Sequence, residues 1–130
     1  MKRILTTLII ILLCIQTIHS NENDAQGSKL KILTFNILHG ATTKGDFDLD
    51  AIAKVIIEAD PDLVALQEVD FKTNRARKYD LVTELGWRTK MAPIFGKAMD
   101  FDGGEYGEGI LSKFSFISTR NVALPFTPGN

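Results

Sequence analysis

The fold is decided by residues 30–68, which read LKILTFNILHGATTKGDFDLDAIAKVIIEADPDLVALQE. Apolar runs at 30–36 and 63–68 each predict a strand with a buried body, and the first is expected to be buried on both faces. Between the two runs, apolar residues recur at helical spacing: Leu49, Ile52, Ala53, Ile56 and Ile57. Asp48 is the predicted N-cap of this helix, and Pro61 lies where the helix must end. The segment therefore predicts a strand–helix–strand unit.

A polar residue closes each of the two predicted strands. Asn36 ends the first apolar run, and Glu68 ends the second. In open α/β sheets, ligand sites form at the carboxyl ends of the strands, where these two side chains are expected to meet. Carboxylate and amide oxygens are hard donors that suit Mg²⁺ with a bound phosphate. Glu68 and Asn36 are therefore predicted as metal ligands, although a strand-end glutamate in solvent and a turn asparagine remain open alternatives.

The N-terminus of the chain predicts a secretory signal peptide at residues 1–20. A positively charged start precedes an apolar stretch at 4–15 and a more polar exit. That stretch is shorter than the ~20 residues needed to cross a bilayer, so we expect a secreted or periplasmic protein with no stable membrane span. Cys14, the only cysteine, falls inside the signal and is interpreted as one of its apolar residues. Residues 21–29 are polar and predict a flexible leader.

Charge and size limit what residues 21–130, the chain without the predicted signal, can be. Removing Lys2 and Arg3 from the 15 basic residues leaves 13 against 16 acidic ones, a formal charge of −3. Broad nucleic-acid binding usually requires a basic excess, which this composition lacks. No cysteine remains for a disulfide, a thiolate metal site or a nucleophile. The segment suits one domain, but no helix is predicted after residue 91 to cover the later strands, so we expect a truncated chain.

The second half of the chain predicts shorter elements with less regular spacing. These are a helix at 79–85 ended by Gly86, a strand at 87–91, a connection at 96–104, and hairpin strands at 109–112 and 116–118. Before them lies a charged loop that holds four cations, Lys72, Arg75, Arg77 and Lys78. These cations either hold an anionic substrate through charge-assisted hydrogen bonds or form a solvated surface.

Three further residues are candidates for contact with a substrate. His39, the only histidine outside the predicted signal, can accept a proton or bind a phosphate, or it is simply a hydrogen-bonding surface residue. The segment 103–112 reads GGEYGEGILS, and its glycines allow close backbone approach to a ligand. Within it, Tyr106 can donate to a phosphate oxygen and Glu108 can orient a base. A glycine-rich hairpin turn is the alternative interpretation.

Three motifs in this sequence resemble those of one known family. They are LTFNILHG at 33–40, DPDLVALQEVD at 60–70 and EYGEGILSK at 105–113. In their order and spacing they are similar to motifs of the endonuclease/exonuclease/phosphatase superfamily, whose members include deoxyribonuclease I. The resemblance covers residues 30–125 and corresponds to the N-terminal portion of such enzymes.

The resemblance implies an α/β fold, here a partial four-layer α/β/β/α sandwich that is truncated. It also implies Mg²⁺ in the cleft between two sheets, and Mn²⁺ or Ca²⁺ suits the same oxygen ligands. By the same resemblance, Glu68 binds the metal, Asn36 assists the metal and the phosphate, and Tyr106 contacts the scissile phosphate. Glu108 stands near a family position that orients a histidine.

Two departures from the family pattern shape the functional hypothesis. The Asp-x-Asn motif and the closing Asp-His pair of the family are expected after residue 130, so this chain carries the metal-binding half of the site. Asp70 stands where deoxyribonuclease-like members tend to have an arginine, which argues against a DNA-specific enzyme.

The favoured hypothesis is a metal-dependent phosphoesterase that hydrolyses a phosphodiester or a phosphomonoester. The substrate is then a phosphorylated small molecule, a phospholipid head group or a nucleic acid, and the full-length protein is expected to be monomeric. The alternative is a non-catalytic secreted remnant that binds an anion or a partner through the loop at 72–78. A doubly wound nucleotide-binding domain would need a glycine-rich turn after the first strand, which residues 36–40 do not provide.

Overall fold

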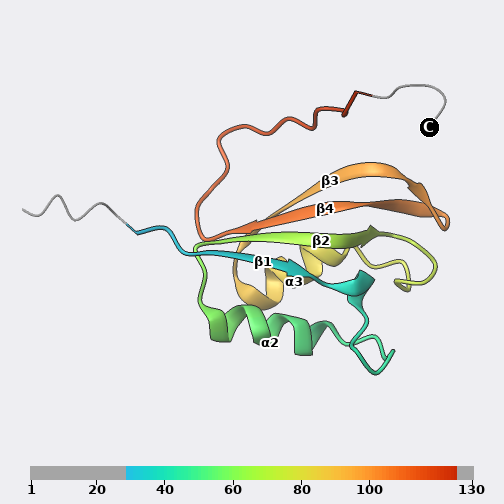
Figure 1. Cartoon of the computed structure of the whole chain (residues 1–130), viewed down its shortest axis with the longest axis horizontal. Helices are drawn as coiled ribbons and strands as arrows, with labels where there is room; N and C mark the ends of the chain where they lie inside the picture. The colour runs from blue at the N-terminus through green and yellow to red at the C-terminus, as the bar shows by residue number, and fades with distance from the viewer. Residues whose placement is uncertain (1–28, 126–130) are drawn as a thin grey trace, which may run out of the picture.

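Residues 29–125 are the part of the chain that the computed structural model describes (Figure 1). The predicted signal peptide at 1–20 and nearly all of the predicted leader lie outside the described residues. The described elements are β1 (Ile32–Asn36), the 3-10 helix η2 (Leu38–Gly40), α2 (Leu49–Ala59), β2 (Leu63–Phe71), α3 (Leu81–Thr89), β3 (Ala92–Phe101) and β4 (Gly104–Ser112). Within residues 29–125, no helix is long and apolar enough to cross a membrane.

β1, α2 and β2 form the unit that the sequence predicts. β1 runs parallel to β2, and α2 is the crossover between them. The Asp48 carboxylate caps α2, because it accepts hydrogen bonds from the backbone N–H groups of Asp50 at 3.0 Å and Ala51 at 2.9 Å. The helix ends before Asp60, whose backbone is left-handed (φ 46°). The strand–helix–strand prediction is confirmed.

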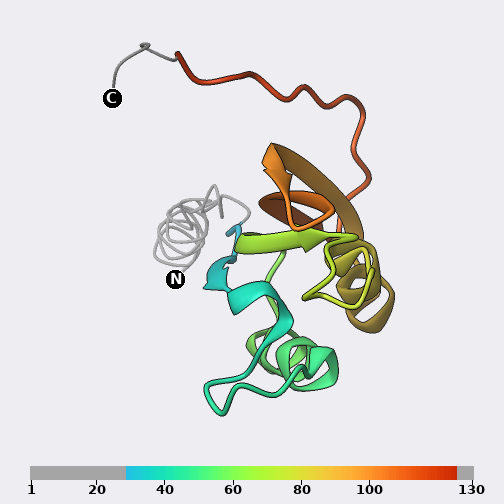
Figure 2. The ribbon, with the colours of Figure 1, turned by 90° about the vertical axis from the view of Figure 1, so that its right-hand side faces the viewer.

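β1 is an edge strand, so the prediction that it is buried on both faces is wrong. The strand order is β1-β2-β4-β3, which leaves β1 with one neighbour in the described sheet. Leu33 and Phe35 pack against the core, whereas Ile32, Thr34 and Asn36 are exposed. The alternation arises because α2 and α3 lie on one side of the sheet (Figure 2). We call the other side, to which Ile32, Thr34 and Asn36 belong, the open face.

The core lies between the two helices and the sheet. Its buried apolar side chains include Leu49, Ile52, Ile56, Val64, Leu66, Val69, Leu81, Leu85 and Leu111. Gly109 of β4 faces the helices, because a Cβ added there would lie 2.7 Å from a methyl group of Val82 in α3. Side chains alternate along a strand, so Tyr106, Glu108 and Ile110 lie on the open face.

Gly86 does not end a helix, as the sequence predicted, but lies inside α3. An added Cβ would approach the Met91 carbonyl oxygen to 2.9 Å and the Pro93 ring to 3.1 Å, so the glycine permits close packing of α3 against the start of β3. Trp87 therefore lies within α3 and not in a strand, and it is 76% exposed. The predicted strand at 87–91 is therefore wrong.

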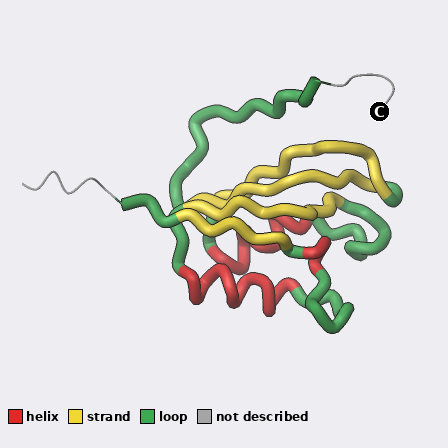
Figure 3. The backbone as a smooth tube through the Cα atoms, in the orientation of Figure 1, coloured by secondary structure: helices red, strands yellow, loops and turns green. Residues whose placement is uncertain are grey.

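β3 and β4 form one long hairpin in the region where a connection at 96–104 was predicted. The turn is made by Asp102 and Gly103, which both have positive φ (46° and 73°). Residues 116–118 form no strand, and the chain after β4 runs as a loop through residue 125 (Figure 3). The predicted pairing of 109–112 with 116–118 is wrong, because β4 pairs with β3 on one side and β2 on the other.

The α/β class predicted from the sequence is confirmed. The described residues contribute one helical layer and one four-stranded mixed sheet, which is part of the layered sandwich that was expected. β2 extends to Phe71, three residues beyond the predicted strand end at Glu68. The pairing of these added residues with β4 matters for the site, because the register shifts between Leu66 and Val69 and this shift decides where Glu68 points.

Candidate functional site

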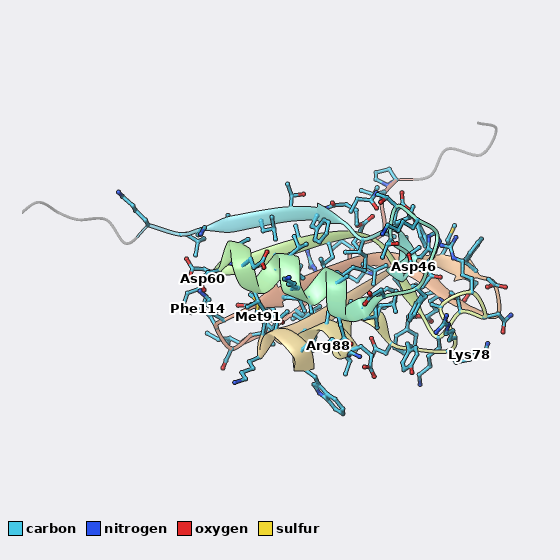
Figure 4. The ribbon with its side chains drawn as sticks, turned by 90° about the horizontal axis from the view of Figure 1, so that it is seen from below. Asp46, Asp60, Lys78, Arg88, Met91 and Phe114 are labelled. Carbon is cyan, nitrogen blue, oxygen red and sulfur yellow. The ribbon has the colours of Figure 1, made fainter. Side chains whose placement is uncertain are left out.

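Asn36, the last residue of β1, is in direct contact with Glu68, which lies three residues before the end of β2. The Nδ2 atom of Asn36 donates a hydrogen bond to Glu68 Oε1 at 2.9 Å. The Oδ1 atom of Asn36 accepts one from the backbone N–H of Leu38, also at 2.9 Å. Seen from below, this end of the sheet is the one where Asp46 and Lys78 are labelled (Figure 4). The two strand-end residues that the sequence singled out are thus brought together.

A β-bulge turns Glu68 away from the core. Val64 and Leu66 of β2 are buried, so regular alternation would bury residue 68 as well. The register between β2 and β4 instead shifts between Leu66 and Val69, and Glu68 adopts a positive φ of 57°. Such a backbone costs a non-glycine residue about 1–3 kcal/mol, and bulges commonly re-aim side chains next to active sites.

Tyr106 and Glu108 of β4 join Glu68 on the open face. Within the shifted register, Gln67 and Glu68 together stand opposite Glu108. Burial raises the pKa of the Glu108 carboxyl, and the charge of Glu68 raises it further. Burial likewise raises the pKa of the Tyr106 hydroxyl, and the charges of Glu68 and Glu108 add to this effect. Two carboxyl groups and a phenol hydroxyl therefore lie close enough to interact electrostatically. A bound cation would reduce the repulsion between their negative charges.

The donor set at this place fits an open metal site and not a closed cage. Among residues 29–125, no group of three or more histidine, cysteine, aspartate or glutamate side chains could hold a metal ion alone. Mg²⁺ in phosphate-processing sites is commonly held by one or two carboxylates, with waters and substrate oxygens completing its octahedron. Glu68, with Glu108 across the bulge and Asn36 beside it, matches that arrangement.

His39 lies in η2, close to Asn36 in sequence but not joined to the other candidates. It has a positive φ of 47°, and its Nδ1 atom is buried without a partner in the described part of the chain. None of the hydrogen bonds found among residues 29–125 links its side chain to Glu68, Tyr106 or Glu108. Its role in phosphate binding stays a prediction.

The four cations of the charged loop do not form a common patch. The Arg77 guanidinium lies over the Phe47 ring, 4.8 Å from its centroid. The Lys78 ammonium donates to the Gly103 carbonyl oxygen at 3.1 Å, which ties the loop to the hairpin turn. Lys72 lies over the ring of its neighbour Phe71. The loop is thus fastened at several points.

The remaining cation, Arg75, belongs to a site that sequence reasoning missed. Its Nε and Nη2 atoms donate to the two carboxylate oxygens of Asp70 at 2.7 and 2.8 Å, and Asp70 is completely buried. Thr73 Oγ1 donates to the same carboxylate at 2.5 Å. The hydrogen bond to Asp70 raises the pKa of Arg75. Only the spacing of Asp70, Thr73 and Arg75 hinted at this cluster.

Comparisons with known proteins agree with this fold. The model of the Endonuclease/Exonuclease/phosphatase family matches residues 33–128. An endonuclease/exonuclease/phosphatase from Beutenbergia cavernae DSM 12333 is similar in structure, with a TM-score of 0.52 and 20% identity over 69% of this chain. A family protein from Leptotrichia buccalis C-1013-b has a TM-score of 0.55 and 18% identity, also over 69% of this chain.

The two similar structures are considerably longer than the part they share with this chain. The match covers 27% of the Beutenbergia protein and 39% of the Leptotrichia protein. No curated protein matches the chain. The family match spans most of the sequence, including the strand ends that carry Asn36 and Glu68 and the β4 segment with Tyr106. The chain therefore belongs to the endonuclease/exonuclease/phosphatase family.

Proposed function

We propose that this chain provides the metal-binding half of a divalent-metal-dependent phosphoesterase. The observation that carries the proposal is the contact between Asn36, at the carboxyl end of β1, and Glu68, on a strained bulge of the parallel strand β2. The family is named for nucleases and phosphatases, which hydrolyse phosphoesters, and its enzymes generally use divalent metals. A carboxylate held at the rim of a sheet, with a second carboxylate opposite, is suited to that chemistry.

Each candidate residue has a distinct role in this proposal. Glu68 is the principal metal ligand, and Asn36 fixes its carboxylate through Nδ2. One lone pair of Asn36 Oδ1 is engaged by the Leu38 N–H, and the other is available to a metal or a phosphate. Tyr106 donates a hydrogen bond from its hydroxyl group to a phosphate oxygen. Glu108 adds negative charge at the metal position and orients a base.

A bound divalent ion supplies Lewis acidity at the phosphoryl oxygen. We propose Mg²⁺ first, and Mn²⁺ or Ca²⁺ is compatible with the same oxygens. The proposed substrate is a phosphodiester or a phosphomonoester, carried by a small molecule, a phospholipid head group or a nucleic acid. With the N-terminal signal expected from the sequence, the enzyme acts outside the cytoplasm, in the periplasm or the medium.

The proposal is tested by adding Mn²⁺ to the ¹⁵N-labelled chain and recording amide spectra. Paramagnetic broadening should appear first at the bulge in β2 and at the facing part of β4, and Glu68→Gln should abolish this localised effect. Glu58→Gln is the matched control, because Glu58 is exposed on α2. Its Oε1 atom lies 3.8 Å from Lys54 Nζ, in an exposed ion pair of the helix. Broadening that persists in Glu68→Gln, or that centres on another acidic region, would make the assignment wrong. A fragment that binds anions without metal would show no localised response.

A further inference from the structure

We propose that Arg75 is an anion-binding residue of the candidate site, whose fixed guanidinium binds a phosphate oxygen of the substrate beside Tyr106. The inference rests on the proposed function and adds a phosphate-recognising group that this chain supplies without a metal. It is built on the position of the guanidinium, on its unused donors and on the way in which the loop around it is held.

The guanidinium is fixed by a carboxylate that has no access to solvent. Asp70 receives two parallel hydrogen bonds from Arg75, a geometry that restricts the planar group to one orientation. Burying a carboxylate is costly unless it is paired and hydrogen-bonded, and Thr73 completes its shell. The Arg75 side chain is nevertheless 34% exposed. Solvent and solutes can therefore reach the arginine of this ion pair but not the aspartate.

The open edge of the guanidinium has donors to spare. An arginine carries five N–H groups, and two nitrogens of Arg75, Nε and Nη2, face Asp70. No acceptor among residues 29–125 is paired with its third nitrogen, Nη1. A positively charged fork whose orientation is already fixed loses little side-chain entropy when it binds a phosphate oxygen.

The guanidinium lies on the same side of the sheet as the candidate metal ligands. Asp70 stands directly opposite Tyr106 in the ladder between β2 and β4, so both side chains belong to the open face. The Cζ atom of Arg75 is 5.6 Å from the centroid of the Tyr106 ring and 4.5 Å from that of Phe101. Glu108 lies two residues further along β4. A phosphate near the Tyr106 hydroxyl would thus meet a fixed cation on one side and the Glu68–Glu108 position on the other.

The loop that carries Arg75 is held in a strained conformation. Lys72, Arg77 and Lys78 all have positive φ, between 55° and 63°. The Arg75 backbone N–H donates to the Asp102 carboxylate at 2.7 Å, and the Asn74 backbone N–H donates to the Asp102 carbonyl oxygen at 3.0 Å. Strained backbone of this kind persists only where the surroundings enforce it, and it is concentrated at ligand sites.

The chain offers a matched control in Arg88 on α3. Its side chain is 31% exposed and pairs with Asp50 at 2.7 Å and Glu84 at 2.6 Å, so it resembles Arg75 in exposure and in pairing. It lies among the helices, on the side of the sheet away from the open face (Figure 4). Any anion effect that is specific to the candidate site should involve Arg75 and spare Arg88.

The test uses inorganic phosphate and the arginine side-chain signals of the whole ¹⁵N-labelled chain, at constant ionic strength and without metal. We expect phosphate to shift the Arg75 Nε–H signal in a saturable way while the Arg88 signal stays in place. Arg75→Lys should weaken phosphate binding about tenfold, since it removes charge-assisted hydrogen bonds, whereas Arg88→Lys should change it less than about twofold. Equal shifts of both signals, no shift of Arg75, or unchanged affinity in Arg75→Lys would overturn the proposal.

Two further measurements keep the test decisive. If Arg75→Lys unfolds, as judged by thermal denaturation, Tyr106→Phe replaces it, because it leaves the ion pair intact and should still reduce the phosphate-induced shift of Arg75. Unchanged phosphate titration in Tyr106→Phe would then contradict a site beside that hydroxyl. In Glu68→Gln the metal response should vanish while the metal-free phosphate shift remains, so failure of the metal assignment and failure of the Arg75 subsite give different results.

Discussion

At the scale of single residues, the site depends on one amide side chain that uses both of its ends. Asn36 donates to Glu68 through Nδ2 and accepts from the Leu38 backbone through Oδ1, so it links the bulge in β2 to the turn after β1. Side chains that orient metal ligands typically influence affinity without being essential for binding. Asn36 is therefore expected to matter for the orientation of Glu68 more than for the stability of the fold.

We expect Asn36→Ala to raise the dissociation constant for Mn²⁺ about tenfold, because the Glu68 carboxylate loses its hydrogen-bond partner. The free energy of unfolding should fall by only about 1 kcal/mol, since Asn36 is exposed and the lost hydrogen bonds are to groups that water can reach. Mn²⁺ titration and urea denaturation measure the two quantities. Thr34→Ala, on the same face of β1, is the control, and equal Mn²⁺ affinity in both variants would contradict the orienting role.

At the scale of elements, the hairpin of β3 and β4 depends on glycines in β4, which allow the two backbones to approach closely. A Cβ added to Gly107 would lie 2.0 Å from the Gly96 carbonyl oxygen, where β3 itself has an irregular register between Lys97 and Met99. The neighbouring backbone cannot yield as a flexible side chain can. Gly107 thus lets β3 pass close to β4 at the level of the candidate site, between Tyr106 and Glu108.

Gly107→Ala is expected to lower the free energy of unfolding by about 3 kcal/mol, the upper end of the range for overpacking. Gly96→Ala is the matched control on the facing strand, because its added Cβ would meet only the Glu108 carbonyl oxygen at an ordinary 3.8 Å. Urea denaturation of both variants gives the comparison. Similar stability of the two would show that the β3 backbone relaxes and that the close approach is not a constraint.

The elements also show what the sequence could reveal and where it failed. The unit from β1 to β2 was predictable, because its capping residue, its helical spacing and its proline are all local signals. β3 was not, because its Gly96, Lys97 and Asp100 are typical of a loop and adopt a strand only through pairing with β4. The bulge at Glu68 was equally hidden, since it depends on the register with β4. Asn36 and Glu68 could still be found, because each closes an apolar run, whereas the pairing of Asp70 with Arg75 had no sequence signal beyond the short spacing of the two residues.

At the scale of the whole molecule, the two faces of the sheet differ. The helices bury one face, while the open face of the described residues combines the candidate site with exposed apolar side chains. Ile32 at the start of β1 is 63% exposed, and Ile110 of β4 is 44% exposed. Apolar side chains grouped on a sheet with an unpaired edge strand promote association between molecules. A single apolar side chain on a helix, such as Trp87, has no such tendency.

We therefore expect the chain, at high concentration, to self-associate through its open face. Ile110→Thr should shift the equilibrium toward the monomer, because threonine keeps the preference for strand while removing apolar surface. Trp87→Gln removes a larger and more exposed apolar group from α3 and should leave the association unchanged. Sedimentation velocity over a range of concentrations measures the effect. A stronger effect of Trp87→Gln than of Ile110→Thr would place the contact on the helices and contradict association through the open face.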